Sequence, residues 1–233
     1  MGGDYMVYMI MAAVLSGIGM LVSNRLKSKF DHYSRIPLQS GLSGKEVAEQ
    51  MLQHYGIHDV KIVPAKGMLT DHYNPQTKTI ALSEPVYGSR SVAAAAVAAH
   101  ECGHAVQHDT SYAWLKMRSA IVPVVNIASK AQQFLMMAAL GMFGMGGNPT
   151  LLFITVIAFG VTAAFSFITL PVEFDASNRA MAWLDEADVA RGTDYDGAKD
   201  ALWWAAMTYV SAALGALVYF VFFALKYAAA SDR

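Results

Sequence analysis

Two histidines four positions apart are the clearest chemical signal in this sequence. His100 and His104 enclose Glu101, Cys102 and Gly103 in the pattern HExxH. On a helix, side chains four residues apart lie on the same face, so both imidazoles can bind one metal ion. Zinc suits this pair because catalytic zinc sites combine three protein ligands with one open coordination position. The pattern therefore predicts one zinc ion held by His100, His104 and a third ligand from another part of the chain.

The residue after the first histidine predicts hydrolytic chemistry. Glu101 would lie beside the ion without binding it, where it can take a proton from an attacking water and pass it to a leaving amine. By composition alone the pattern would arise in only about 0.5% of such chains, which favours function over a helix with two ordinary polar histidines. Cys102 points to a different side of the helix, so we expect a packed thiol and not a ligand.

Two carboxylates further along the chain compete to be the third ligand. Glu173 and Asp175 follow Pro171, and proline suits the first turn of a helix. Both carboxylates would then lie in that first turn, where the helix dipole favours acidic residues for structural reasons alone. The spacing of the residues does not choose between the two.

An oxyanion that develops during peptide hydrolysis needs a hydrogen-bond donor besides the metal, and three residues are candidates. His72 and Tyr73 fall in a predicted strand, which could also pair with an extended substrate backbone. Arg179 is the third candidate. The alternatives are turn and packing chemistry for His72 and Tyr73, and a charge next to the membrane for Arg179.

Local signals predict the elements that must position these residues. Residues 91–107 form an alanine-rich run without proline, which predicts a helix that carries both histidines. Ser43 and Glu46 have the form of a capping box, which predicts the start of a short amphipathic helix. Asn74 and Pro75 favour a turn between two strands. The predicted strands are residues 60–63, 68–73 and 79–82.

The composition indicates a membrane protein. Hydrophobic residues make up 55% of the 233 residues and charged residues only 15%, far from the average of soluble proteins. The net charge of -1 offers no excess of basic residues, so a nucleic acid is not expected as a partner. The single cysteine excludes an intrachain disulfide, which permits a cytoplasmic location.

Four apolar stretches are long enough, or nearly so, to cross a hydrocarbon layer of about 30 Å. They are residues 5–22, 121–143, 151–170 and 201–225. The first lacks a basic leader and should remain as an anchor. The second contains polar residues that would face protein, water or lipid headgroups: Asn126, Lys130, Gln132 and Gln133. We therefore predict a mainly α-helical, polytopic membrane protein with four transmembrane helices.

Basic residues flank these stretches mainly on one side, which the positive-inside rule assigns to the cytoplasm. They are Arg25, Lys27, Lys29, Arg35, Lys116, Arg118 and Arg179. Residues 23–119 and 171–200 lie on this side, separated in sequence by a membrane hairpin but able to meet in space. We predict that they form a small α+β, zincin-like catalytic domain within a single membrane peptidase unit, residues 1–233.

Three segments carry a resemblance to a known family: LTDHY at 69–73, VAAHECGHAVQ at 97–107 and LPVEFDAS at 170–177. They resemble the bacterial neutral zinc metallopeptidases of the YugP-like family, and the resemblance extends over nearly the whole chain. It implies a protein of the bacterial inner membrane and a distant similarity to integral-membrane proteases of the prenyl-protein-protease type.

In that wider group the third ligand is a glutamate in an E-x-x-A-D pattern on a later helix. The resemblance therefore implies that Glu173 is the ligand, ahead of Asp175, and that Ala176 matches the alanine. Ser177 stands where the wider group has aspartate, so Asp175 is an alternative for any role of that aspartate.

Together these features predict a zinc-dependent endopeptidase that cleaves membrane-associated or unfolded polypeptides near the cytoplasmic membrane face. The alternative is a non-catalytic zinc-binding membrane scaffold. A transporter would require ionisable groups within the spans, and only Lys130 offers one. The sequence contains no signal for the oligomeric state.

Overall fold

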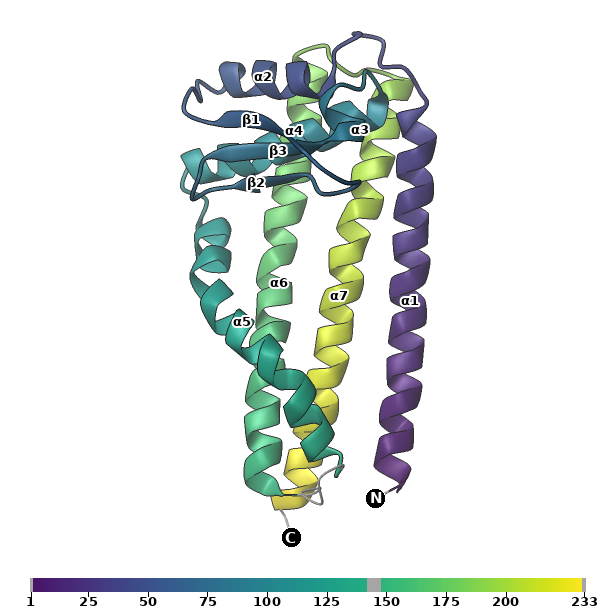
Figure 1. Ribbon diagram of the computed structural model, residues 1–233, viewed down its shortest axis with the longest axis vertical. Helices are drawn as coiled ribbons and strands as arrows, with labels where there is room; N and C mark the ends of the chain where they lie inside the picture. Colours follow the sequence, from purple (N-terminus) through teal and green to yellow (C-terminus); the bar gives the residue numbers. More distant parts are fainter. Residues whose placement is uncertain (1, 142–147, 232–233) are drawn as a thin grey trace. The chain divides into compact units, whose positions relative to one another are not determined.

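The computed structural model describes residues 2–141 and 148–231, which are mainly helical (Figure 1). The elements are α1 (Gly2–Ser34), α2 (Gly44–His54), β1 (Lys61–Ala65), β2 (His72–Asn74), β3 (Thr79–Ser83), α3 (Glu84–Tyr87), α4 (Val92–Asp109), α5 (Ala113–Ala139), α6 (Pro149–Glu186) and α7 (Thr193–Ser231). They fall into two compact units. The helical unit comprises residues 1–22, 117–170 and 208–233, and the α/β unit comprises residues 23–116 and 171–207.

Within the described residues, three helices are long and apolar enough to cross a membrane: Tyr5–Ser34 of α1, Pro149–Glu186 and Thr193–Ser231. Three of the four predicted spans therefore have helices of suitable length and composition, and the span predicted at 121–143 is not confirmed. Polar residues lower the hydropathy of α5, and Gln132 donates hydrogen bonds to Ala158 O and Thr162 Oγ1 of α6. Residues 142–143 of that predicted span lie outside the described residues.

The prediction of a separate helix that starts at Pro171 is wrong. α6 runs without interruption from Pro149 to Glu186, and Pro171 lies inside it. A proline inside a helix removes one hydrogen bond and costs about 3 kcal/mol, so packing on both sides of this point must offset that cost. The neighbouring residue Val172 is fully buried. Glu173 consequently lies in the interior of a long helix. The attraction of acidic residues to a helix N-terminus therefore does not explain its position.

The α/β unit contains a three-stranded sheet in the order β1-β3-β2. β1 is parallel to β3, and β2 is antiparallel to it with Tyr73 opposite Ile80. The turn between β2 and β3 is fixed by the Asn74 side chain, which accepts hydrogen bonds from the backbone N–H groups of Gln76 and Thr77. β2 begins at His72 and not at residue 68 as predicted, because Leu69 has a positive φ of 56°, which no strand residue adopts.

α4 is the buried centre of the α/β unit. It begins after Ser91, whose side chain accepts a hydrogen bond from Ala94 N. Every alanine of this helix is buried, and the small side chains let α2, α3, β2 and β3 approach it. α2 starts with the predicted capping box of Ser43 and Glu46 and packs Val47 and Met51 into the same core. The histidine motif is thus held on the most enclosed helix of the unit.

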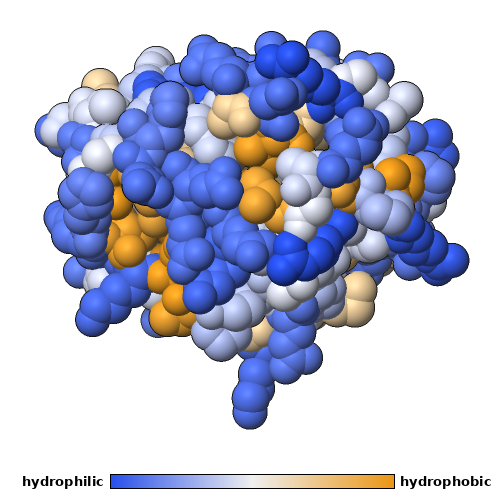
Figure 2. Space-filling view, turned by 90° about the horizontal axis from the view of Figure 1, so that it is seen from above, coloured by the Kyte–Doolittle hydropathy of each residue, from blue (hydrophilic) through white to orange (hydrophobic). Residues whose placement is uncertain are grey.

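The exposed side chains distinguish surfaces suited to water from surfaces suited to lipid. The face seen in Figure 2 is covered mainly by hydrophilic side chains, and hydrophobic ones are confined to separate small areas. In the helical unit, by contrast, α1 exposes large apolar side chains such as Met6, Ile10 and Leu21. A helix of this length with exposed apolar side chains is suited to a hydrocarbon environment.

Candidate metal centre

Three side chains from two helices converge in the α/β unit. His100 and His104 of α4 direct their Nε2 atoms toward Glu173 of α6, at 3.4 and 3.6 Å from Glu173 Oε2. Candidate ligand atoms of the three residues all lie within 4.8 Å of one another. Tetrahedral zinc with bonds of about 2.0–2.1 Å places neighbouring ligand atoms about 3.3 Å apart. The donor set and its spacing therefore fit zinc.

The surroundings of these side chains favour a cation. Glu173 is only 2% exposed and His104 is buried, while the two imidazoles pack edge to face with centroids 4.8 Å apart. Burial lowers the pKa of His104, but the Glu173 carboxylate more than offsets this, so the pKa lies above its usual value. A buried carboxylate requires a compensating positive charge, which either protonated histidine or a bound metal ion supplies.

Gly103 allows the two helices to cross closely enough for this convergence. A β-carbon on Gly103 would lie 2.4 Å from the backbone oxygen of Ala176, far inside contact distance. Glu173 lies one helical turn before Ala176, so the crossing brings its carboxylate onto the histidine face. The sequence prediction missed this role. The signal in the sequence was the glycine itself, because glycine inside a helix costs about 1 kcal/mol relative to alanine. Such a glycine indicates close packing or a functional role.

The outer nitrogens of both histidines have polar partners. His104 Nδ1 lies 3.0 Å from Gln107 Oε1, and His100 Nδ1 lies 3.1 Å from Ser177 Oγ. Ser177 thus contacts a histidine from the position at which the resemblance places aspartate. The sequence did not single out Gln107, although it lies one turn after His104 on the same helix face.

Asp175 has different partners from Glu173. Its Oδ2 accepts a hydrogen bond from Gln107 Nε2 at 2.7 Å and pairs with Arg179 Nε at 2.6 Å. Metal coordination by Asp175 would compete with both contacts. The geometry therefore favours Glu173 over Asp175 as the third ligand.

Glu101 and Cys102 differ in what their burial implies. Glu101 is 7% exposed, and burial raises the pKa of its carboxyl while the imidazoles of His100 and His104 oppose the shift. A carboxylate in such surroundings accepts a proton more readily than one in water. Cys102 is fully buried, its Sγ lies 3.6 Å from Ala48 O, and burial raises the pKa of its thiol. It is the packed thiol that was expected.

The three candidates for oxyanion stabilisation each have other partners. Tyr73 lies on β2, which packs against α4, and its hydroxyl is 2.7 Å from Nδ1 of His108, one turn beyond His104. His72 is exposed and donates from Nδ1 to Thr70 O at 2.8 Å. Arg179 pairs with Asp175, and its guanidinium carbon lies 5.8 Å from the centre of the Tyr112 ring. Their catalytic role stays a prediction.

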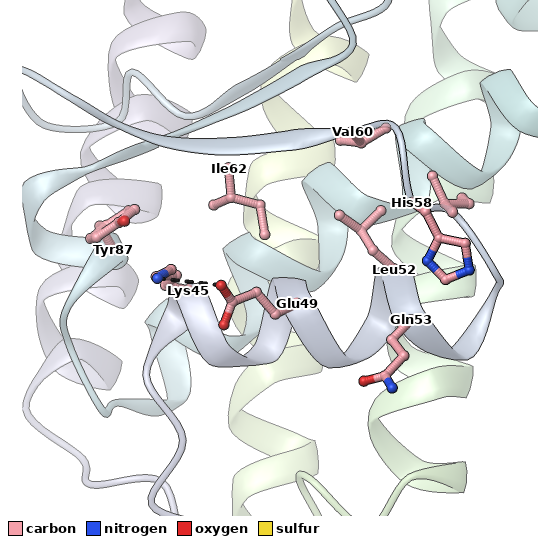
Figure 3. Close-up of a pocket in the computed structure, with 9 residues that line it drawn as sticks. Lys45, Glu49, Leu52, Gln53, His58, Val60, Ile62 and Tyr87 are labelled. Atoms are coloured by element: carbon pink, nitrogen blue, oxygen red, sulfur yellow. Dashed lines mark ion pairs between the residues drawn. The ribbon is translucent and has the colours of Figure 1, made fainter.

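A pocket in the α/β unit is distinct from this centre. It has a volume of about 470 Å³ and lies between α2 and β1, with Leu52 and Ile62 on its walls (Figure 3). An ion pair between Lys45 and Glu49 lines another part of it. His100, His104 and Glu173 are not among its lining residues, so the metal centre does not open into it.

Within its described residues the protein has three helices long and apolar enough to cross a membrane, and a His-His-Glu group that could hold a metal ion. Residues 5–227 match the model of the family described as "Putative neutral zinc metallopeptidase", so the chain belongs to this family and the resemblance found in its sequence is confirmed. The chain is similar to "Putative membrane protease YugP" of Bacillus subtilis (strain 168), with 39% identity over 212 residues, 91% of this chain and 92% of the relative. No solved structure matches the chain significantly.

Proposed function

We propose that this protein is a zinc-dependent endopeptidase that hydrolyses membrane-associated or unfolded polypeptides near the cytoplasmic face of the bacterial inner membrane. The observation that carries the proposal is the convergence of His100, His104 and Glu173 within 4.8 Å in a member of a zinc metallopeptidase family. These three residues would hold one zinc ion and leave a fourth coordination position open.

In this proposal Glu101 is the general base and acid. Zinc bound at this site would supply Lewis-acid polarisation of the substrate carbonyl and of a water. Glu101 would take the proton from the attacking water and deliver it to the nitrogen of the leaving amine. Its burial favours the protonated state that it must hold between these two transfers. Tyr73, His72 or Arg179 would donate a hydrogen bond to the developing oxyanion.

The proposed membrane arrangement uses four spans. The apolar helices α1, α6 and α7 support three of them, and α5 would be the fourth, with Gln132 facing α6. By the positive-inside rule, the basic residues favour a cytoplasmic location for residues 23–119 and 171–200. These segments would form a zincin-like catalytic domain, and the compact α/β unit supports such a domain. The partners would be a polypeptide substrate and the lipid bilayer, with no role for nucleic acid.

The test is to purify the full chain in detergent, measure its zinc content and follow cleavage of fluorescently labelled casein as an unfolded substrate. About one zinc per chain is expected. Glu101→Gln should abolish cleavage and leave the zinc content unchanged, whereas Glu49→Gln on the exposed face of α2 should change neither. Full activity in Glu101→Gln would overturn the proposed mechanism. Zinc binding without cleavage of any peptide would instead favour a non-catalytic zinc-binding scaffold.

A further inference from the structure

Gln107 is fully buried and makes three hydrogen bonds at the edge of the metal centre. Its Oε1 lies 3.0 Å from His104 Nδ1, and its Nε2 donates to Val172 O at 2.8 Å and to Asp175 Oδ2 at 2.7 Å. These bonds use both hydrogens of the amide and its oxygen. A buried side chain with such complete bonding has one well-defined orientation.

The bonding pattern determines which nitrogen of His104 carries its proton. A backbone oxygen and a carboxylate oxygen only accept hydrogen bonds, so the amide nitrogen of Gln107 must face Val172 and Asp175. The amide oxygen then faces His104 and can only accept, which requires a proton on Nδ1. In the neutral imidazole, Nε2 therefore has the free lone pair, and this atom faces Glu173. A histidine must present such a lone pair to bind a metal ion.

The same amide also joins the two helices that supply the ligands. Gln107 belongs to α4, and its partners Val172 and Asp175 lie on both sides of Glu173 in α6. The contact with His100 is different in kind, because the Ser177 hydroxyl can either donate or accept and so fixes no tautomer. Arg179 supplies the positive charge beside Asp175, which completes a chain from Arg179 through Asp175 and Gln107 to His104.

We propose that Gln107 is a positioning residue of the metal centre. It holds the Nδ1-protonated tautomer of His104 and fastens α4 to the segment of α6 that carries Glu173, and Asp175 and Arg179 orient the Gln107 amide. This inference rests on the proposed zinc site and adds the means by which that site is kept ready for the ion.

The test measures zinc affinity by competition with a chromophoric chelator, together with the visible absorption of the Co²⁺-substituted protein. Gln107→Leu keeps the side-chain size but removes all three bonds, so it should weaken zinc binding about 10–100-fold and alter the cobalt spectrum. Gln53→Leu is the matched control, because Gln53 is exposed on α2, and it should leave both measurements unchanged.

A double variant keeps the test decisive if Gln107→Leu does not fold. Gln107→Glu alone places a carboxylate against Asp175 and should weaken zinc binding. Gln107→Glu combined with Asp175→Asn restores a donor opposite the new carboxylate, whereas the bond to Val172 O stays lost, so the double variant should recover part of the loss. Unchanged zinc affinity in Gln107→Leu and in Gln107→Glu, or no recovery in the double variant, would overturn the inference.

These outcomes are separable from failure of the proposed function. If the unsubstituted protein binds zinc but cleaves no peptide, the peptidase proposal fails, and weaker binding in Gln107→Leu still supports the positioning role. If the unsubstituted protein binds no zinc, both proposals are overturned.

Discussion

Gly103 of α4 meets the backbone of Ala176 of α6 at a distance that excludes any side chain, because a β-carbon on Gly103 would lie 2.4 Å from the Ala176 oxygen. The atom it would strike belongs to a helix backbone and cannot rotate away. An alanine here would force α4 and α6 apart and withdraw Glu173 from the two histidines.

We therefore predict that Gly103→Ala destabilises the protein and weakens zinc binding. Helix propensity alone would make this substitution stabilising by about 1 kcal/mol, whereas overpacking costs about 1–3 kcal/mol, so the sign of the change identifies the cause. Thermal unfolding and chelator competition measure the two effects. Gly88→Ala is the control, since a β-carbon there meets nothing within 4 Å. A more stable Gly103→Ala protein with full zinc affinity would show that the helices do not cross as described.

Removing the charge of Glu173 and removing the charge of Asp175 are predicted to weaken zinc binding to different extents. Glu173→Gln should weaken zinc binding by more than the roughly 10–100-fold change typical of residues that only orient a ligand. Asp175→Asn should fall within or below that range, because Asp175 contacts Gln107 and Arg179. Zinc affinity of the two variants, measured side by side by chelator competition, decides between them. The reverse order would make Asp175 the third ligand.

Local patterns in the sequence were sufficient for the elements that depend on neighbouring residues. The spacing of His100 and His104 predicted that they share a helix face, and Ser43 with Glu46 predicted the start of α2. Both predictions depend only on residues about one helical turn apart. The apolar stretches in α1, α6 and α7 were also evident. In the first two cases the controlling interactions lie within one or two helical turns, and for the apolar stretches a continuous run of hydrophobic residues is sufficient.

The contacts that complete the centre could not be predicted in this way. Gln107 bonds to residues 65 and 68 positions away, and no periodicity in the sequence encodes such a pairing. Pro171 was misinterpreted because a proline in a helix is favoured in the first turn, whereas here the packing of a long helix outweighs that preference. The span predicted at 121–143 is not confirmed, because polar residues interrupt it, and one of them, Gln132, finds partners in α6.

Tyr73 is predicted to assist catalysis without affecting metal binding. If its hydroxyl donates to the oxyanion, Tyr73→Phe should lower kcat about 10²–10³-fold and leave zinc affinity unchanged. Burial raises the pKa of Tyr73 to about 12, so the phenol keeps its proton throughout the neutral range. Any change of rate below about pH 10 must therefore come from another group and should persist in the variant.

The pH-rate profiles of the unsubstituted protein and Tyr73→Phe provide the measurement. Tyr87→Phe is the control, because Tyr87 lines the pocket beside α2 and is not one of the three residues of the candidate metal group. Unchanged kcat in Tyr73→Phe would eliminate this residue and leave His72 and Arg179 as the candidates.

Removal of zinc is predicted to lower the thermal stability of the protein. A ligand that binds only the folded state adds about 4 kcal/mol to the free energy of unfolding when its free concentration is a thousand times Kd. Tm should therefore rise with the free zinc concentration set by a metal buffer. Glu173→Gln should flatten this dependence because it removes a proposed ligand, whereas Glu101→Gln should retain it because Glu101 is proposed to act on protons and not on the ion. A Tm that does not respond to free zinc in the unsubstituted protein would mean that His100, His104 and Glu173 converge for a structural reason alone.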